Sequence, residues 1–194
     1  DVVPTSPSGS VPSGAGKYLA LAIPALIGAA LARRYYDTYM AQKIEHLAPG
    51  VYAVLNGGGN SLVIDGGSEV LLVDPKFPPF SHRLRGWIAR NIDAPVTQVV
   101  NTHYHYDHSQ GNVLYPQATI HYQSNVPDLL LSSDNEFSDP DWWSNHRLAI
   151  PGDRVNGKRR LTVGTQRVEL QSVGPAHTHG DLIVYLPEHE IVAT

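Results

Sequence analysis

T-H-Y-H-Y-D-H, residues 102–108, is the most informative stretch of this sequence. It follows the apolar run Thr97–Asn101, which we predict to be a β-strand, so its side chains should lie on a loop held by a sheet. In an extended backbone alternate side chains point the same way, so His103, His105 and Asp107 should face one point. The side chain of His108 should then face a point beside it. Imidazoles and carboxylates suit Zn²⁺, or Fe and Mn with the same geometry. We therefore predict a metal site formed by His103, His105, Asp107 and His108.

A second histidine segment lies between two further predicted strands. It is G-P-A-H-T-H-G-D, residues 174–181. One histidine delivered from this loop would complete a three-histidine site with an open fourth position for water. From the residues alone, either His177 or His179 can serve.

Both segments resemble signatures of the metallo-β-lactamase superfamily. The first is similar to its H-x-H-x-D-H motif, and the second is similar to its later G-H-T segment, in which the histidine before the threonine is the ligand. The resemblance covers residues 47–194 and implies an αββα sandwich with the site at the edge between two β-sheets. It implies one metal held by His103, His105 and His177, and a second metal held by Asp107 and His108.

The resemblance also assigns supporting roles. Asp74, which ends the strand L-L-V-D, would support the metal ligands from behind, although Asp-Pro is also a good turn starter. His179 would lie beside the ligands on the rim, or face solvent. The family's bridging aspartate and last histidine are absent, because the sequence stops at Thr194 within an apolar run. We interpret this as a C-terminal truncation that leaves the second metal site two ligands short.

The activity that the resemblance implies is hydrolysis by a metal-bound hydroxide, with one or two Zn²⁺ ions as cofactor. Asp107 would orient the hydroxide and accept its proton. The expected substrate is a small ester, amide, lactone or thioester. An iron-dependent oxidoreductase or dioxygenase of the same fold is an alternative, and a metal-binding fragment without catalysis is another. A Ser-His-Asp elbow and a phosphate loop are both absent from the sequence.

Composition limits the fold and the classes of partner. The 194 residues are 42% apolar and 16% charged, which predicts one globular domain. A formal charge of -4, without a Lys/Arg block, disfavours a nucleic-acid surface and favours a small-molecule partner. Phe137 and D-P-D-W-W, residues 139–143, could form an apolar wall for it, or both tryptophans could pack in the core. The absence of cysteine excludes disulfides and thiolate zinc sites.

The first 43 residues differ from the rest. Residues 1–16 are rich in Pro, Ser and Gly and predict a disordered tail. Residues 17–43 predict an apolar helix, whose uncharged run, residues 18–32, is shorter than the about 20 residues of a membrane crossing. We interpret this helix as a membrane anchor or export signal, with a soluble helix as the alternative. The protein is therefore predicted to be membrane-associated or exported, with a cytoplasmic location still possible.

Short β-type runs and one amphipathic helix make up the rest of an α/β pattern. We predict an antiparallel meander of three strands at 51–55, 61–65 and 70–74, a helix at 80–91, and strands at 118–122, 166–173, 182–186 and from 191 onward. Asn156-Gly157 is a type I′ turn signal and predicts a hairpin between 153–155 and 160–163.

Overall fold

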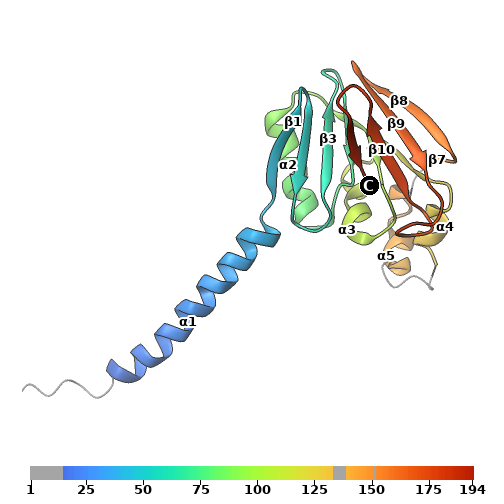
Figure 1. Cartoon of the computed structure of the whole chain (residues 1–194). Coiled ribbons are helices and arrows are strands. Elements are labelled where there is room, and N and C mark those ends of the chain that lie inside the picture. Colours follow the sequence, from blue (N-terminus) through green and yellow to red (C-terminus); the bar gives the residue numbers. More distant parts are fainter. Residues whose placement is uncertain (1–14, 133–138, 151) are drawn as a thin grey trace, which may run out of the picture. The chain divides into compact units, whose positions relative to one another are not determined.

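A computed structural model describes residues 15–132, 139–150 and 152–194 (Figure 1). The chain divides into two units, residues 1–41 and residues 42–194. In the first unit, helix α1 (Ala15–Tyr35) continues into a π-helical turn, η1 (Tyr36–Met40). The predicted tail lies outside the described residues, apart from the two positions that begin α1.

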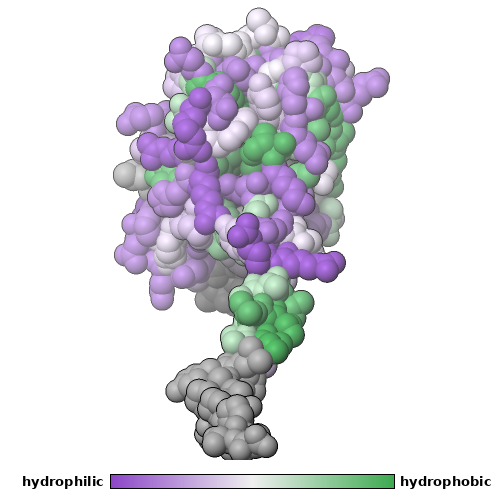
Figure 2. All heavy atoms as spheres, turned by 90° about the vertical axis from the view of Figure 1, so that its left-hand side faces the viewer, coloured by the Kyte–Doolittle hydropathy of each residue, from purple (hydrophilic) through white to green (hydrophobic). Residues whose placement is uncertain are grey.

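Residues 22–32 of helix α1 present an apolar surface. Ile23, Leu26, Ile27 and Leu31 are all more than half exposed, and Figure 2 shows this part of the helix as a hydrophobic surface. Nevertheless, none of the helices in the described ranges is long and apolar enough to cross a membrane. The interpretation of residues 18–32 as a transmembrane anchor is therefore not supported. The predicted helix also ends too late, because Lys43 already begins a strand.

The larger sheet contains seven strands in chain order. They are β1 (Lys43–Ala48), β2 (Val51–Leu55), β3 (Ser61–Asp65), β4 (Val70–Val73), β5 (Val96–Val100), β6 (Thr119–Gln123) and β7 (Asp153–Val155). The first four strands are antiparallel, as the meander prediction requires, and β4 to β7 are parallel. Helix α2 (Phe80–Asn91) makes the crossover between β4 and β5. Parallel pairing brings the ends of β4 and β5 to one edge of the sheet.

The smaller sheet is antiparallel and has the order β11-β10-β9-β8. Its strands are β8 (Lys158–Val163), β9 (Gln166–Ser172), β10 (Leu182–Leu186) and β11 (Ile191–Ala193). The predicted hairpin at Asn156-Gly157 is wrong, since β7 pairs with β6 in the larger sheet while β8 pairs with β9. This turn therefore carries the chain from one sheet to the other.

Two cores define three layers. One lies between the larger sheet and its helices, and includes Leu84 and Ile88 of α2 and the fully buried Trp143. Helices α4 (Val126–Leu130) and α5 (Pro140–Asn145) contribute to the same core. The other core lies between the two sheets. The mixed α/β sandwich is thus confirmed, although all of these helices lie on the larger sheet, so the described residues supply an αββ part of the expected αββα order. Trp143 packs in the core, and Phe137 lies outside the described residues.

Candidate metal centre

Three loops at one end of the sandwich carry the predicted site. The first follows β4 and holds Asp74. The second follows β5 and leads through residues 102–105 into the short helix α3 (Tyr106–Ser109). The third, residues 173–181, connects β9 to β10 in the other sheet. It is tied to the second loop by a backbone hydrogen bond of 2.7 Å from Leu182 N–H to the Thr102 carbonyl. The site therefore lies where the edges of the two sheets meet.

Three of the predicted ligands converge. His103, His105 and His177 each offer a ligand atom, and these atoms lie within 4.8 Å of one another. The ring of His177 is 4.9 Å from each of the other two rings, centroid to centroid. His103 is buried, His105 is half-buried and His177 is exposed. This gradient leaves one side of the cluster open to solvent.

Hydrogen bonds fix the tautomer of His103. The Thr102 hydroxyl donates to Asp74 Oδ2 at 2.6 Å, so its oxygen accepts a hydrogen bond from His103 Nδ1 at 3.0 Å. The lone pair of His103 is therefore on Nε2, which is buried and has no hydrogen-bond partner within the described part of the chain. Burial, with a contribution from His108, lowers the pKa of His103 to about 4. The ring is neutral at pH 7, as a metal ligand must be.

Asp74 supports two loops at once. Its carboxylate accepts hydrogen bonds from Thr102 N–H at 2.8 Å, from the Thr102 hydroxyl, and from His108 Nδ1 at 2.8 Å. Burial of the His108 ring opposes protonation, but the attraction of Asp74 and this hydrogen bond outweigh it and raise the pKa of His108. The structure thus places Asp74 directly behind the histidine cluster, and it is only 2% exposed.

Asp107 and His108 lie beside the three histidines. The expectation of an extended backbone is wrong here, because both residues belong to the helical turn α3, which begins at Tyr106. Helical geometry turns consecutive side chains by about 100°, so Asp107 does not continue the alternation of the preceding histidines. Asp107 Oδ2 is 3.7 Å from His108 Nε2, and the Asp107 side chain is 29% exposed. The structure supplies two potential ligands for a second ion here.

The third loop distinguishes between its two histidines. Asp181 accepts hydrogen bonds from the N–H and hydroxyl of Thr178 at 2.8 and 2.5 Å, and this holds His177 in the cluster. His179 is exposed, and its carbonyl accepts a hydrogen bond from Asn125. The Thr178 hydroxyl also accepts from Gly180 N–H, so the chain turns between the two histidines. His179 thus faces solvent, as the alternative interpretation expects, and its supporting role stays a prediction.

Lys76 is a residue of the site that sequence reasoning missed. It is fully buried, and its ammonium donates to the carbonyls of Val54, Asn56 and Gly59 at 3.0, 2.9 and 2.5 Å. Burial lowers its pKa to about 8 against the attraction of the Asp74 and Asp107 carboxylates. Lys76 holds the glycine loop, residues 57–59, against His108.

Thr102 and Asp181 were also missed as supporting residues. Both are small polar side chains directly before or after a predicted strand, and both are buried. A buried Asn101–Asn112 pair adds a further connection, because Asn101 donates to the His108 carbonyl at 3.1 Å. The available sequence signal was their position at strand ends next to the histidines.

The cluster suits a divalent transition metal. Three imidazoles around one point, with an open side, form the donor set of a catalytic zinc site. The unpartnered Nε2 of His103 is the observation that supports this fit, because a buried nitrogen lone pair normally has a partner.

Comparison with known proteins identifies the family. The sequence model of the metallo-β-lactamase superfamily matches residues 54–194. The chain belongs to this superfamily. Membership confirms the resemblance of the two histidine motifs, and it indicates a metal-dependent hydrolase.

Solved metallo-β-lactamases share the fold. The enzyme from Pontibacter korlensis is 19% identical with a TM-score of 0.64, over 78% of this chain and 70% of that one. BJP-1, a subclass B3 metallo-β-lactamase of Bradyrhizobium japonicum, is 18% identical with a TM-score of 0.61, over 78% and 60%. VMB-1 is 21% identical with a TM-score of 0.60, over 79% and 68%. At such identities the likeness extends to the fold alone, and the chain spans only part of each relative.

Proposed function

We propose that this chain is a zinc-dependent hydrolase that acts on a small ester, amide, lactone or thioester. The observation that carries the proposal is the convergence of three imidazole donors, with His103 Nε2 buried and unpartnered by any described residue. His103, His105 and His177 would hold the ion. When bound, the ion would supply Lewis acidity, lowering the pKa of a water and polarising a carbonyl oxygen.

The protein's own residues would position the groups that react. Asp107 lies on the rim of the cluster, partly exposed, where its carboxylate can accept a proton from water. Thr102 and Asp74 hold His103 in one tautomer, so the donor atom needs no rearrangement. Binding of a second ion by Asp107 and His108 would need further ligands, so we expect one ion to predominate.

The partner that we propose is a small molecule. The rim residues His105 and His177 leave the cluster open to solvent. The net charge of -4 supports an uncharged or weakly charged substrate over nucleic acid.

Metal content tests the proposal directly. The purified chain, dialysed against zinc, is expected to hold about one zinc by elemental analysis, and His103→Ala and His105→Ala should lose it. His82→Ala is the matched control, since His82 is exposed on α2. The loaded chain is then assayed with a β-lactam, a lactone and a thioester. Iron in place of zinc in the chain as purified would favour redox chemistry. Absence of bound metal, or equal binding by the His103 variant, would contradict the proposal.

A further inference from the structure

The Asn156-Gly157 turn is a sequence motif that the metal centre does not use. It carries the chain from β7 in the larger sheet to β8 in the smaller one. Asn156 is exposed and Gly157 is half-buried. The sequence contains one other Asn-Gly pair, Asn56-Gly57, so the two pairs can be compared within one molecule.

An Asn-Gly pair can react without an enzyme. The glycine nitrogen attacks the side-chain carbon Cγ of the asparagine and gives up its proton, and the side-chain nitrogen leaves as ammonia, so that a cyclic succinimide forms. Water then opens the ring at one of its two carbonyls, which gives aspartate or isoaspartate. Glycine favours the attack because it has no β-carbon to hinder it. The asparagine side chain and the peptide group that follows it must both be free to rotate.

The atoms that react are unrestrained at Asn156. Neither this residue nor the N–H of Gly157 makes a hydrogen bond with any residue that the structure describes. A β-carbon on Gly157 would meet nothing within 4 Å, so the space around this peptide group is open. The Gly157 carbonyl, which takes no part in the ring closure, accepts a hydrogen bond from Ser172 N–H at 2.8 Å.

The second pair is restrained at the corresponding atoms. Lys76 Nζ donates to the Asn56 carbonyl at 2.9 Å, and Asn56 N–H donates to Asn60 Oδ1 at 3.2 Å. Gly57 is buried, and a β-carbon on it would lie 2.6 Å from the Phe80 ring. Rotation of this peptide group therefore requires a local opening of the glycine loop.

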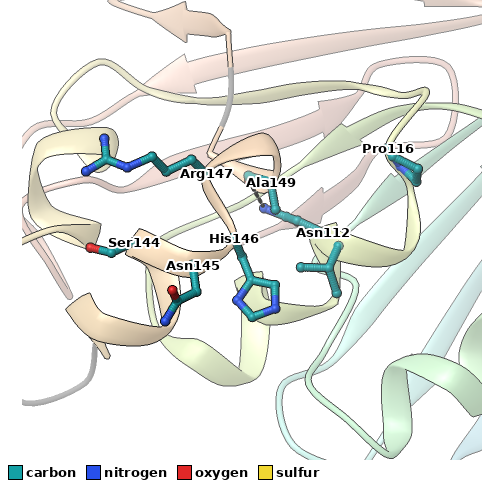
Figure 3. A pocket seen from close by; sticks show the side chains of 8 residues that line it. Asn112, Pro116, Ser144, Asn145, His146, Arg147 and Ala149 are labelled. Carbon is teal, nitrogen blue, oxygen red and sulfur yellow. Dashed lines mark hydrogen bonds between the residues drawn. The ribbon is translucent and has the colours of Figure 1, made fainter.

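Asparagines beside a cavity of the domain show another kind of restraint. Asn112 and Asn145 line a cavity of about 360 Å³ between the 3-10 helix η2 (Gln110–Leu114) and α5 (Figure 3). Their side-chain amides donate to the carbonyls of Ala149 and Asp141 at 3.3 and 2.9 Å, and Figure 3 shows the first of these bonds as a dashed line. Neither asparagine precedes a glycine. Asn156 thus differs from them both in its free side chain and in the residue that follows it.

We propose that Asn156 is a site of spontaneous deamidation, and that the contacts of the folded chain protect Asn56. The reaction replaces a neutral amide by a carboxylate in the turn that joins the two sheets. The isoaspartyl product also lengthens the main chain by one carbon atom between β7 and β8, beside the hydrogen bond from Ser172 to Gly157. The turn therefore loses stability as the protein ages. The proposal does not depend on the proposed hydrolase activity.

Peptide mapping by mass spectrometry, after incubation of the whole chain at mildly alkaline pH, tests the proposal. Electron-transfer fragmentation distinguishes aspartate from isoaspartate. In the folded protein Asn156 should react at least about ten-fold faster than Asn56, because Asn56 reacts only after local opening. In urea both pairs lose their restraints and should react at similar rates. Asn156→Gln keeps an amide but lengthens the side chain, so it should abolish the product at this position and leave Asn56 unchanged.

A stability measurement tests the effect on the turn. The isoaspartyl form, separated by chromatography, should melt about 2–4 °C below freshly prepared Asn156→Asp, the shift expected for the loss of one hydrogen bond. Asn156→Asp is the matched control, because it has the new charge and an ordinary main chain. Equal melting temperatures would overturn the proposed loss of stability in the turn.

Two results would overturn the assignment of the site. One is an equal rate at Asn56 and Asn156 in the folded protein, which would show that the contacts of Asn56 give no protection. The other is the absence of product at Asn156 in the folded protein when the sample in urea has reacted, which would show that the folded turn protects this pair.

Discussion

Thr102 joins the histidine loop to β4, and its hydroxyl is the atom that orients His103. Thr102→Val removes this hydroxyl and keeps the shape of the side chain. We expect zinc affinity to fall about 10- to 100-fold, because the ring loses the acceptor that fixes its tautomer. Competition with a chromophoric chelator measures this. Thr119→Val, at an exposed position of β6, is the control, and equal affinity in both variants would show that Thr102 has no orienting role.

Lys76 stabilises the glycine loop through three carbonyls. In Lys76→Met these acceptors lose their donor inside the protein, and we expect the free energy of unfolding to fall by about 3 kcal/mol. Urea unfolding followed by circular dichroism measures the change. Lys158→Met, at an exposed position of β8, should change stability by less than about 0.5 kcal/mol. A cost as small as this for Lys76→Met would mean that the loop does not depend on the ammonium.

Residues that could be identified from their spacing alone have partners close in the chain, whereas the roles of His177 and Asp74 came from the family resemblance. His103 and His105 belong to one short motif. The role of Thr102 depends on Asp74, 28 positions away, and Lys76 bonds to Val54, 22 positions away. A single sequence contains no signal for such pairs, because only the packing of the sheet brings them together.

At the scale of elements, the turn after α3 depends on a close approach between backbones. A β-carbon on Gly111 would lie 2.1 Å from the Pro75 carbonyl oxygen, and Gly111 N–H donates to the Lys76 carbonyl at 2.7 Å. Gly111→Ala should therefore destabilise the domain by about 3 kcal/mol or more, since backbone atoms must shift. Thermal unfolding measures this.

Gly152→Ala is the matched control for that prediction. A β-carbon there would meet nothing within 4 Å. The two variants should differ clearly in melting temperature, and equal melting temperatures would contradict the close approach at Gly111.

Element type was easier to predict than pairing. The ranges of β2, β3, α2 and β10 agree with the sequence pattern residue for residue. The hairpin at Asn156-Gly157 failed because the turn signal is local, whereas the partner of β7 is β6, aligned through the pair His121 and Asp153. Tertiary pairing determined which sheet each strand joined.

The whole domain contains a second buried histidine whose charge state affects stability. His121 is 4% exposed, and its Nδ1 is 2.5 Å from Asp153 Oδ2, on the neighbouring strand. Burial lowers its pKa below the ordinary value of 6.5, although Asp153 opposes this. The unfolded chain therefore binds more protons than the folded chain below that pH. Stability is fully present above pH 6.5 and is lost as the pH falls through the range below it.

Urea unfolding at several pH values between 7.5 and 5 tests this prediction on metal-free protein. His121→Gln should reduce the loss of stability on acidification, leaving the part that belongs to His103 and His105, whose pKa values are also lowered by burial. His82→Gln, which changes an exposed residue of α2, should leave the dependence of the free energy of unfolding on pH unchanged. If the free energy of unfolding of the His121 variant depends on pH as that of the unchanged protein does, the pKa of this ring does not change on folding.

The two cores of the domain explain why the site could be located from the sequence. Strands β4 and β5 belong to one sheet and β10 to the other, so the loops at their ends meet only because the sheets pack face to face. The family motifs predicted that these loops lie close together. Strand β1 was missed because its burial pattern is almost entirely exposed, so its residues show no apolar alternation.

The central claim is that three histidines from the two sheets form one metal centre. Zinc X-ray absorption spectroscopy on the loaded chain measures this most directly. The account predicts about three imidazole nitrogens at about 2.0–2.1 Å around zinc, and about two in His177→Ala. A spectrum dominated by oxygen ligands, or one that His177→Ala leaves unchanged, would contradict it.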